Sequence, residues 1–301
     1  MKKKLSLVVI ICLLAFFIFP TFVSEGGCNN VYTTKNIVPS QTSQSHTGNS
    51  LQKDLQRDYW AVLIGINNYP GTSNDVPFSI NEILSFRNTL LDGGNWLDSH
   101  IQVLTDNNAT IDGVFNALKW LDENEDENDI SIIYYAGHGS RNSSNERLQI
   151  YDGYISDTDL DAKLDDMEGS MVIILDCCFS GGFIEEVGER GRVVLTACQK
   201  DSFTYQDYNL KSGIFGYFVN LSLQKITKGA EGTFLVAYVS SIIYSKKLSQ
   251  EYEADYTIYP CVYDGIFGRT KIIKYHSYVN TFLPGLFPMS SRNDHLRIWK
   301  L

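Results

Sequence analysis

Two apolar runs of this chain each stop at a reactive side chain, and the two side chains are forty positions apart. Residues 130–136 (ISIIYYA) lead to His138, and residues 171–176 (MVIILD) lead to Cys178, each close to glycines. Such β-branched runs, bounded by glycine, are typical of fully buried strands. In open α/β sheets, sites form at the carboxyl ends of the strands. We therefore expect an imidazole and a thiol to meet at one edge of a sheet.

The two side chains have the chemistry of a nucleophile and its base. Because a free thiol is only a few per cent ionised at neutral pH, a nucleophilic Cys178 needs a nearby imidazole, which His138 can supply. Gly139 and Gly181 have no Cβ, so backbone N–H groups there can approach a substrate carbonyl. The pattern predicts acyl transfer. For Cys177 we favour an ordinary buried residue, since strand alternation places it on the face opposite Cys178.

The segments around these residues resemble the catalytic motifs of caspase-like cysteine peptidases of clan CD, particularly the metacaspase-like and prokaryotic branches. Residues 135–139 (YAGHG) resemble the histidine motif, and residues 176–181 (DCCFSG) resemble the cysteine motif. The resemblance covers about residues 58–272. Phe179 stands where many metacaspases have His, and the Gln-Ala-Cys-Arg-Gly signature of animal caspases is absent. Neither departure removes a catalytic group.

The resemblance implies a cysteine endopeptidase in which Cys178 attacks the scissile carbonyl and His138 is the general acid and base. It implies an oxyanion hole made by the backbone N–H groups of Gly139 and Cys178. We interpret Asp176 as a residue that positions the loop of the nucleophile. A cysteine phosphatase is disfavoured, because Ile184 stands where that class needs Arg. The alternative is a catalytically silent caspase-like domain that only binds peptides or protein partners.

The resemblance also implies a binding site for a basic side chain. Metacaspases carry an acidic pocket residue after the first strand, and Glu82 in residues 81–83 matches it, while Asp201 resembles the second pocket acid. Two carboxylates would favour Arg or Lys on the N-terminal side of the cleaved bond (P1). Otherwise Glu82 would lie on an exposed helix face and Asp201 in a solvated loop. A further hypothesis is autocatalytic cleavage after Arg190 or Arg192.

Strands and helices alternate along the chain. This order predicts an α/β three-layer sandwich, with a mainly parallel, doubly wound sheet of about six strands in the caspase-like manner. The expected strands are 60–66, 101–105, 130–136, 148–151, 171–176, 192–197 and 257–263. The expected helices are 79–91, 111–121, 157–167, 214–223 and 235–248. Residues 274–301 form a tail without a clear period.

One acidic segment has the ligand spacing of a calcium loop. Its members are Asp157, Asp159, Asp161 and Glu168. Ala162 stands where the loop needs Gly, and an amphipathic helix with a capping box at Ser156 explains the same residues. We therefore expect no metal site or cofactor here, and dependence on calcium stays open because metacaspases often show it.

The start of the chain predicts export. Three lysines followed by an apolar run are typical of a signal peptide or signal anchor over residues 1–24, and residues 25–57 have the composition of a flexible polar linker. Cleavage near Ser24, retention as an anchor and lipid attachment at Cys28 are three alternatives. We expect the peptidase domain, residues 58–273, to be extracytoplasmic, either secreted or tethered to a membrane only through the N-terminal segment.

Composition bounds the partners. A chain of 301 residues with 44% hydrophobic residues can bury one sizeable core. The formal net charge is −10, so we expect peptide or protein substrates and no nucleic-acid partner, because no basic face exists to neutralise phosphates.

Overall fold

The computed structural model describes residues 57–71, 74–266, 270–274 and 298–301. The predicted signal segment, nearly all of the predicted linker and most of the tail lie outside these residues. Within the described part, no helix combines the length and the apolarity that a membrane crossing requires.

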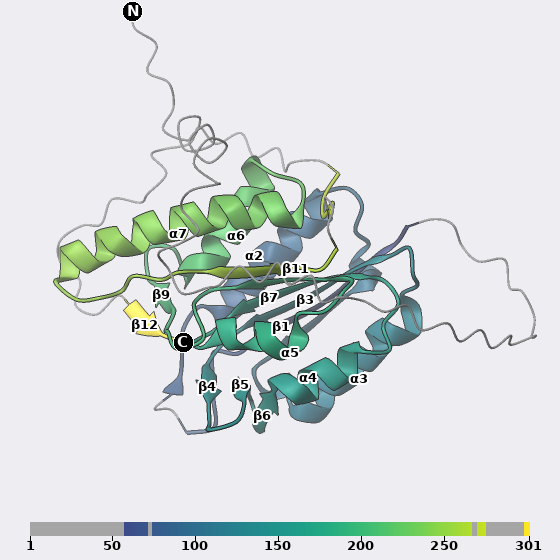
Figure 1. Cartoon of the computed structure of the whole chain (residues 1–301), viewed down its shortest axis with the longest axis horizontal. Coiled ribbons are helices and arrows are strands. Elements are labelled where there is room, and N and C mark those ends of the chain that lie inside the picture. The colour runs from purple at the N-terminus through teal and green to yellow at the C-terminus, as the bar shows by residue number, and fades with distance from the viewer. Residues whose placement is uncertain (1–56, 72–73, 267–269, 275–297) are drawn as a thin grey trace, which may run out of the picture.

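A six-stranded sheet forms the centre of the domain, in the order β11-β8-β7-β3-β1-β2 (Figure 1). Its strands are β1 (Tyr59–Gly65), β2 (Ile101–Thr105), β3 (Ile130–Ala136), β7 (Ser170–Asp176), β8 (Arg192–Thr196) and β11 (Cys261–Asp264). Five run parallel, and β11 is antiparallel to β8. β11 begins later than predicted, since Pro260 before it has no N–H to donate to a ladder.

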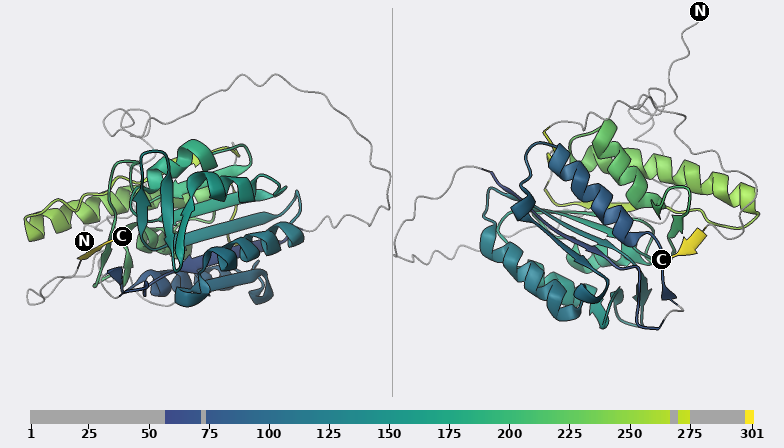
Figure 2. Two further views of the ribbon diagram at one scale, coloured as in Figure 1. Left: turned by 90° about the horizontal axis from the view of Figure 1, so that it is seen from below. Right: turned by 180° about the vertical axis from the view of Figure 1, so that it is seen from behind.

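Helices cover both faces of this sheet (Figures 1 and 2). One face carries α2 (Ser79–Asp92), α6 (Ile214–Lys225) and α7 (Ala230–Tyr252), and the other carries α3 (Ile111–Asn124), α4 (Asp157–Leu164) and α5 (Ile184–Val187). Alternate side chains of β3 divide between two buried clusters: Ile133 and Tyr135 enter one, and Ile132 and Tyr134 enter the other. The predicted three-layer α/β fold is confirmed.

Two small sheets complete the domain. One contains β4 (Gly139–Arg141), β5 (Glu146–Ile150) and β6 (Gly153–Ser156); the other contains β10 (Ser212–Gly213), β9 (Tyr205–Asp207) and β12 (Ile298–Lys300). Of these six strands only the one around 148–151 was expected. The others have four residues or fewer, which is too short for a two-residue period to show in the sequence.

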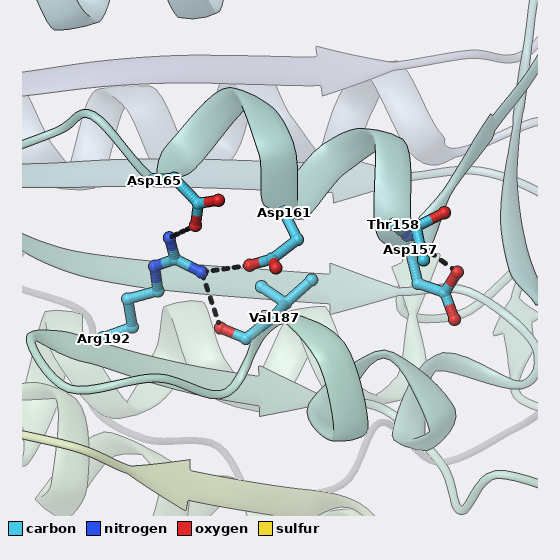
Figure 3. A network of polar contacts seen from close by, with 6 residues as sticks. All are labelled: Asp157, Thr158, Asp161, Asp165, Val187 and Arg192. Carbon is cyan, nitrogen blue, oxygen red and sulfur yellow. Dashed lines mark hydrogen bonds and ion pairs between the residues drawn. The ribbon is translucent and has the colours of Figure 1, made fainter.

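Arg192, the first residue of β8, connects this strand to helix α4 (Figure 3). Its buried guanidinium donates to the carboxylates of Asp161 and Asp165 and to the carbonyl of Val187. An arginine held in this way within a parallel sheet is not accessible for cleavage, so the hypothesis of autocatalysis after Arg192 is wrong. Arg190, two positions earlier, is exposed.

The acidic segment that resembles a calcium loop is a helix. Ser156 and Asp159 form a capping box at the start of α4, as the helical interpretation predicts. Asp161 is engaged by Arg192 rather than turned toward the other acids of the segment. Among the described residues, no group of three or more His, Cys, Asp and Glu side chains is arranged to hold a metal ion.

Candidate active site

The site is built where β3 and β7 end. These strands are parallel neighbours, and Ala136 pairs with Asp176. His138 comes two positions after Ala136 and Cys178 two positions after Asp176, so both residues follow the same level of the sheet. The α-carbon of Gly139 lies so close to the carbonyl oxygen of Cys178 that a Cβ there would overlap it. The structure thus brings the segments of the predicted base and nucleophile together, with glycine permitting their close approach.

Three groups hold His138. Its backbone N–H donates to the hydroxyl of Tyr69 at 2.8 Å, and its carbonyl accepts from the hydroxyl of Tyr135 at 2.8 Å. Its ring Nε2 lies 2.7 Å from the carbonyl oxygen of Asn74. Because a carbonyl only accepts, we assign the ring proton to Nε2, which leaves Nδ1 as the basic atom.

The protonation of His138 suits a base. Burial lowers the pKa of its imidazole, and the hydrogen bond to the Asn74 carbonyl opposes that shift without reversing it. The ring is therefore neutral at neutral pH and can accept a proton. No residue type in the sequence marks Asn74 as a partner of His138, because the contact uses a main-chain carbonyl that every residue possesses.

Cys178 is closed off from solvent. The residue is 1% exposed. Its Sγ lies 3.4 Å from the backbone nitrogen of Thr204 and 3.6 Å from the carbonyl oxygen of the same residue. Burial raises the pKa of the Cys178 thiol to about 12, although the Thr204 N–H acts in the opposite direction. The thiol is thus protonated in this arrangement, and its use as a nucleophile requires that it be uncovered.

Cys177 does not lie on the face opposite Cys178, so that expectation is wrong. β7 ends at Asp176, before either cysteine, and strand alternation therefore no longer applies to them. Both cysteines pack in the same buried cluster. The Cys177 carbonyl accepts from the thiol of Cys198 at 3.5 Å, and burial raises the pKa of the Cys177 thiol well above its usual value.

Glu82 lies in the first turn of α2 and is not on an exposed face of that helix: its buried carboxyl group lies against the start of helix α6. It is 2% exposed, and its carboxyl accepts hydrogen bonds from the hydroxyls of Tyr134 and Ser212, both at 2.8 Å, and from the N–H of Gly213 at 2.5 Å. Burial raises the pKa of Glu82, although these hydrogen bonds act in the opposite direction. The N–H groups at a helix start favour a carboxylate, which explains why this position tolerates an acid.

Asp176, the last residue of β7, lies against Glu82. Its carboxyl accepts from the N–H of Gly216 at 2.7 Å and from the hydroxyl of Thr204 at 3.4 Å, and both carboxyl groups lie beside Gly213. Burial and then the charge of Glu82 raise the pKa of Asp176 well above its usual value. Thr204 also contacts Cys178, so a hydrogen bond links Asp176 to the loop residue beside the nucleophile; a positioning role for Asp176 stays a prediction.

Asp201 does not join Glu82, so the expected pairing of these two acids is wrong. The Asp201 side chain is 73% exposed and forms an ion pair with Arg141. It follows β8 in a turn, where solvent reaches it, whereas Asp176 is carried by a central strand to the start of α6. The acid beside Glu82 is therefore Asp176.

The segment Ile298–Leu301 also reaches this site. The N–H of Leu301 donates at 3.1 Å to the Thr204 carbonyl, which the thiol of Cys178 contacts as well. Leu301 is 2% exposed and packs in the same cluster as Cys178. No sequence pattern indicates this contact, because four residues are too few for a periodicity and the bond is between backbone groups.

Comparisons with known proteins agree with the resemblance that the sequence motifs indicate. The family model described as the caspase domain matches residues 58–265. Metacaspase-7 from Arabidopsis thaliana is 29% identical over 181 residues, which cover 54% of this chain and 45% of that protein. Metacaspase-4 from the same plant is 30% identical over 148 residues, covering 43% and 35%. Metacaspase-1 from Schizosaccharomyces pombe is 28% identical over 100 residues, covering 31% and 23%. The chain thus spans less than half the length of these relatives.

A solved structure shares the fold. A protein from Geobacter sulfurreducens superposes with a TM-score of 0.53, covering 73% of this chain and 97% of that chain at 13% identity. At this identity the likeness concerns the fold alone.

Proposed function

This chain belongs to the caspase domain family of cysteine peptidases, and on that premise we propose that it is an endopeptidase with Cys178 as nucleophile and His138 as general acid and base. One observation carries the proposal. The parallel register of β3 and β7 sets both residues two positions beyond the pair Ala136 and Asp176, with Gly139 against the Cys178 carbonyl. A thiol and a neutral imidazole at adjacent strand ends are the parts that acyl transfer needs.

The reaction starts when the Cys178 thiol gives its proton to Nδ1 of His138 and its sulfur bonds to the substrate carbonyl carbon. The backbone N–H groups of Gly139 and Cys178 stabilise the oxyanion. His138 then donates the proton to the leaving amine as the C–N bond breaks, which leaves a thioester on Cys178. Water, deprotonated by His138, hydrolyses the thioester and restores the thiol.

We propose further that the enzyme cleaves after Arg or Lys. The carboxyl groups of Glu82 and Asp176 are buried together, and Asp176 is only two positions before the nucleophile. Ionisation of both groups without a cation is unfavourable in a low dielectric. A guanidinium or ammonium group from the substrate would compensate the pair, so a basic P1 residue is bound in preference to a neutral or acidic one.

The alternative is a domain that binds peptides without turnover, and the burial of Cys178 favours it. A peptide library incubated with the unaltered chain and with Cys178→Ala separates the two functions. Cleavage by the unaltered chain alone supports the peptidase. Peptide binding without cleavage by either form, and no alkylation of Cys178 by a peptidyl electrophile, would establish the silent domain.

A further inference from the structure

The side of strand β9 that pairs with β12 leads directly to the nucleophile. β9 is the middle strand of its sheet, paired with β10 on one side and with β12 on the other. The residue before β9 is Thr204, whose N–H and carbonyl oxygen both lie beside Sγ of Cys178. A peptide that pairs with β9 on the β12 side and continues by one residue therefore arrives at the thiol.

The segment Ile298–Leu301 makes this approach. Its register places Ile298 opposite Asp207, Trp299 opposite Gln206 and Lys300 opposite Tyr205. Leu301 then donates its N–H to the Thr204 carbonyl at 3.1 Å. The segment thus runs toward Cys178 from its amino end to its carboxyl end.

This direction is the one that a substrate needs. In the proposed reaction the acyl half of the substrate precedes the cleaved bond, so its chain must approach Cys178 in the same direction as residues 298–301. Addition of a strand to an exposed sheet edge is a recurrent mode of peptide recognition, in which the main chain contributes affinity and alternate side chains contribute specificity.

Two side chains of this segment pack in or against the cluster that contains the nucleophile. Trp299 and Leu301, two positions apart, both pack against the buried cluster that contains Cys178, as the strand period requires. Trp299 also meets the ring of Phe78 edge to face, with centroids 5.4 Å apart. Between them, Lys300 is exposed and its Nζ lies 3.0 Å from the centroid of the Phe203 ring.

We propose that residues 298–301 occupy, within the same chain, the strand position of the acyl half of a peptide substrate, and that they keep Cys178 closed until a substrate displaces them. The proposal rests on the proposed function for the identity of the competing ligand. It accounts for a nucleophile that is only 1% exposed.

Alkylation of Cys178, followed by mass spectrometry, tests the proposal without requiring turnover. In the full chain, Trp299→Ala should increase the rate of alkylation by an arginyl chloromethyl ketone at least about tenfold, since a tryptophan packed at a contact of this kind supplies much of its affinity. Ile243→Ala, at a residue that is 41% exposed on α7, is the control and should leave the rate within about twofold. An unchanged rate in Trp299→Ala would overturn the proposal.

The peptide Ile-Trp-Lys-Leu, added to the Trp299→Ala chain, should slow alkylation again, whereas Ile-Ala-Lys-Leu should not. The peptide must be added at concentrations on the order of millimolar, because a free peptide has to replace a segment that is tethered to the site. Faster alkylation that Ile-Trp-Lys-Leu does not reverse would show that Trp299 only supports the fold, and would overturn the proposal.

Two further measurements cover the remaining outcomes. If Trp299→Ala does not fold, hydrogen exchange of the unaltered chain decides: attachment of the peptidyl electrophile to Cys178 should accelerate exchange in residues 298–301, and unchanged exchange would refute their displacement. Binding of Ile-Trp-Lys-Leu to the chain with both Trp299→Ala and Cys178→Ala reports the β9 edge alone. Binding there, with no alkylation of Cys178 in any form, would count against the peptidase and in favour of the occupied edge.

Discussion

The carboxyl groups of Glu82 and Asp176 are buried together against the start of helix α6, which donates a backbone N–H to each of them. Burial and the charge of the neighbouring carboxylate both raise the pKa of Asp176, so ionisation of both groups together is unfavourable. The protonation of this pair, at the end of the strand before the nucleophile, therefore depends on pH. The pair also connects β7 to helix α6.

The first prediction concerns stability against pH. Burial raises the pKa of both acids, so above about pH 4, the value of an unfolded carboxyl, the folded state binds more protons than the unfolded state. The free energy of unfolding contributed by the pair is then greatest below that pH and falls as the pH rises toward the folded values. Thermal unfolding of Asp176→Asn between about pH 4 and 8 should show a smaller decline than the unaltered chain. Identical slopes would contradict the protonated pair.

The second prediction concerns the nucleophile and its base. Cys178→Ala and His138→Ala should each reduce kcat/KM by at least about a thousandfold, and the double variant should lose little more, because both residues serve one step. Cys177→Ser should keep most of the activity, since Cys177 packs beneath the site and its thiol takes no part in the reaction. An essential thiol at Cys177 would show that the motif register is wrong.

The third prediction concerns substrate preference. Values of kcat/KM for matched substrates with Arg, Lys, Asp or Asn at P1 should rank the two basic residues first. Glu82→Gln and Asp176→Asn should each weaken the preference for Arg over Asn by about tenfold or more, because each removes one buried charge partner. Asp201→Asn is the matched control and should leave the preference unchanged, since Asp201 is exposed and paired with Arg141. Preference for Asp or Asn over Arg would exclude the basic specificity.

The fourth prediction concerns the acid limb of the pH profile. His138 acts as a base only when neutral, and burial lowers its pKa below the usual value of about 6.5. We therefore expect kcat/KM to be retained down to a pH below that value and to fall as the imidazole becomes protonated. An acid limb at or above about pH 6.5 would show that another group controls the activity, or that His138 is exposed to solvent in the free enzyme.

The fifth prediction concerns location. The full chain should be found in the membrane or secreted fraction, because residues 1–24 have the pattern of an export signal. A chain that begins at residue 50 should be soluble, folded and retained in the cytoplasm. Recovery of the full chain in the cytoplasm, with the shorter chain insoluble, would show that the first residues belong to the fold.

The central sheet and the position of the two reactive residues follow from the sequence, because both are carried by local patterns. The runs 101–105 and 130–136 are strands with the predicted bounds. Residues 130–136 are buried at every position and all but Ser131 are apolar, so a strand covered on both faces is visible here as a run of seven letters. Since successive parallel strands end at one edge, His138 and Cys178 could be expected to lie near each other before any tertiary contact was known.

Other features of the site were decided by the tertiary structure alone. The folded chain selects Asp176 rather than Asp201 as the neighbour of Glu82, turns the carbonyl of Asn74 toward His138, and lays residues 298–301 along β9. The first depends on where a strand end meets a helix start. The other two use backbone N–H and carbonyl groups, which nearly every residue possesses, between segments that are far apart in the sequence. No residue type marks such contacts, so only the packing of the layers determines them.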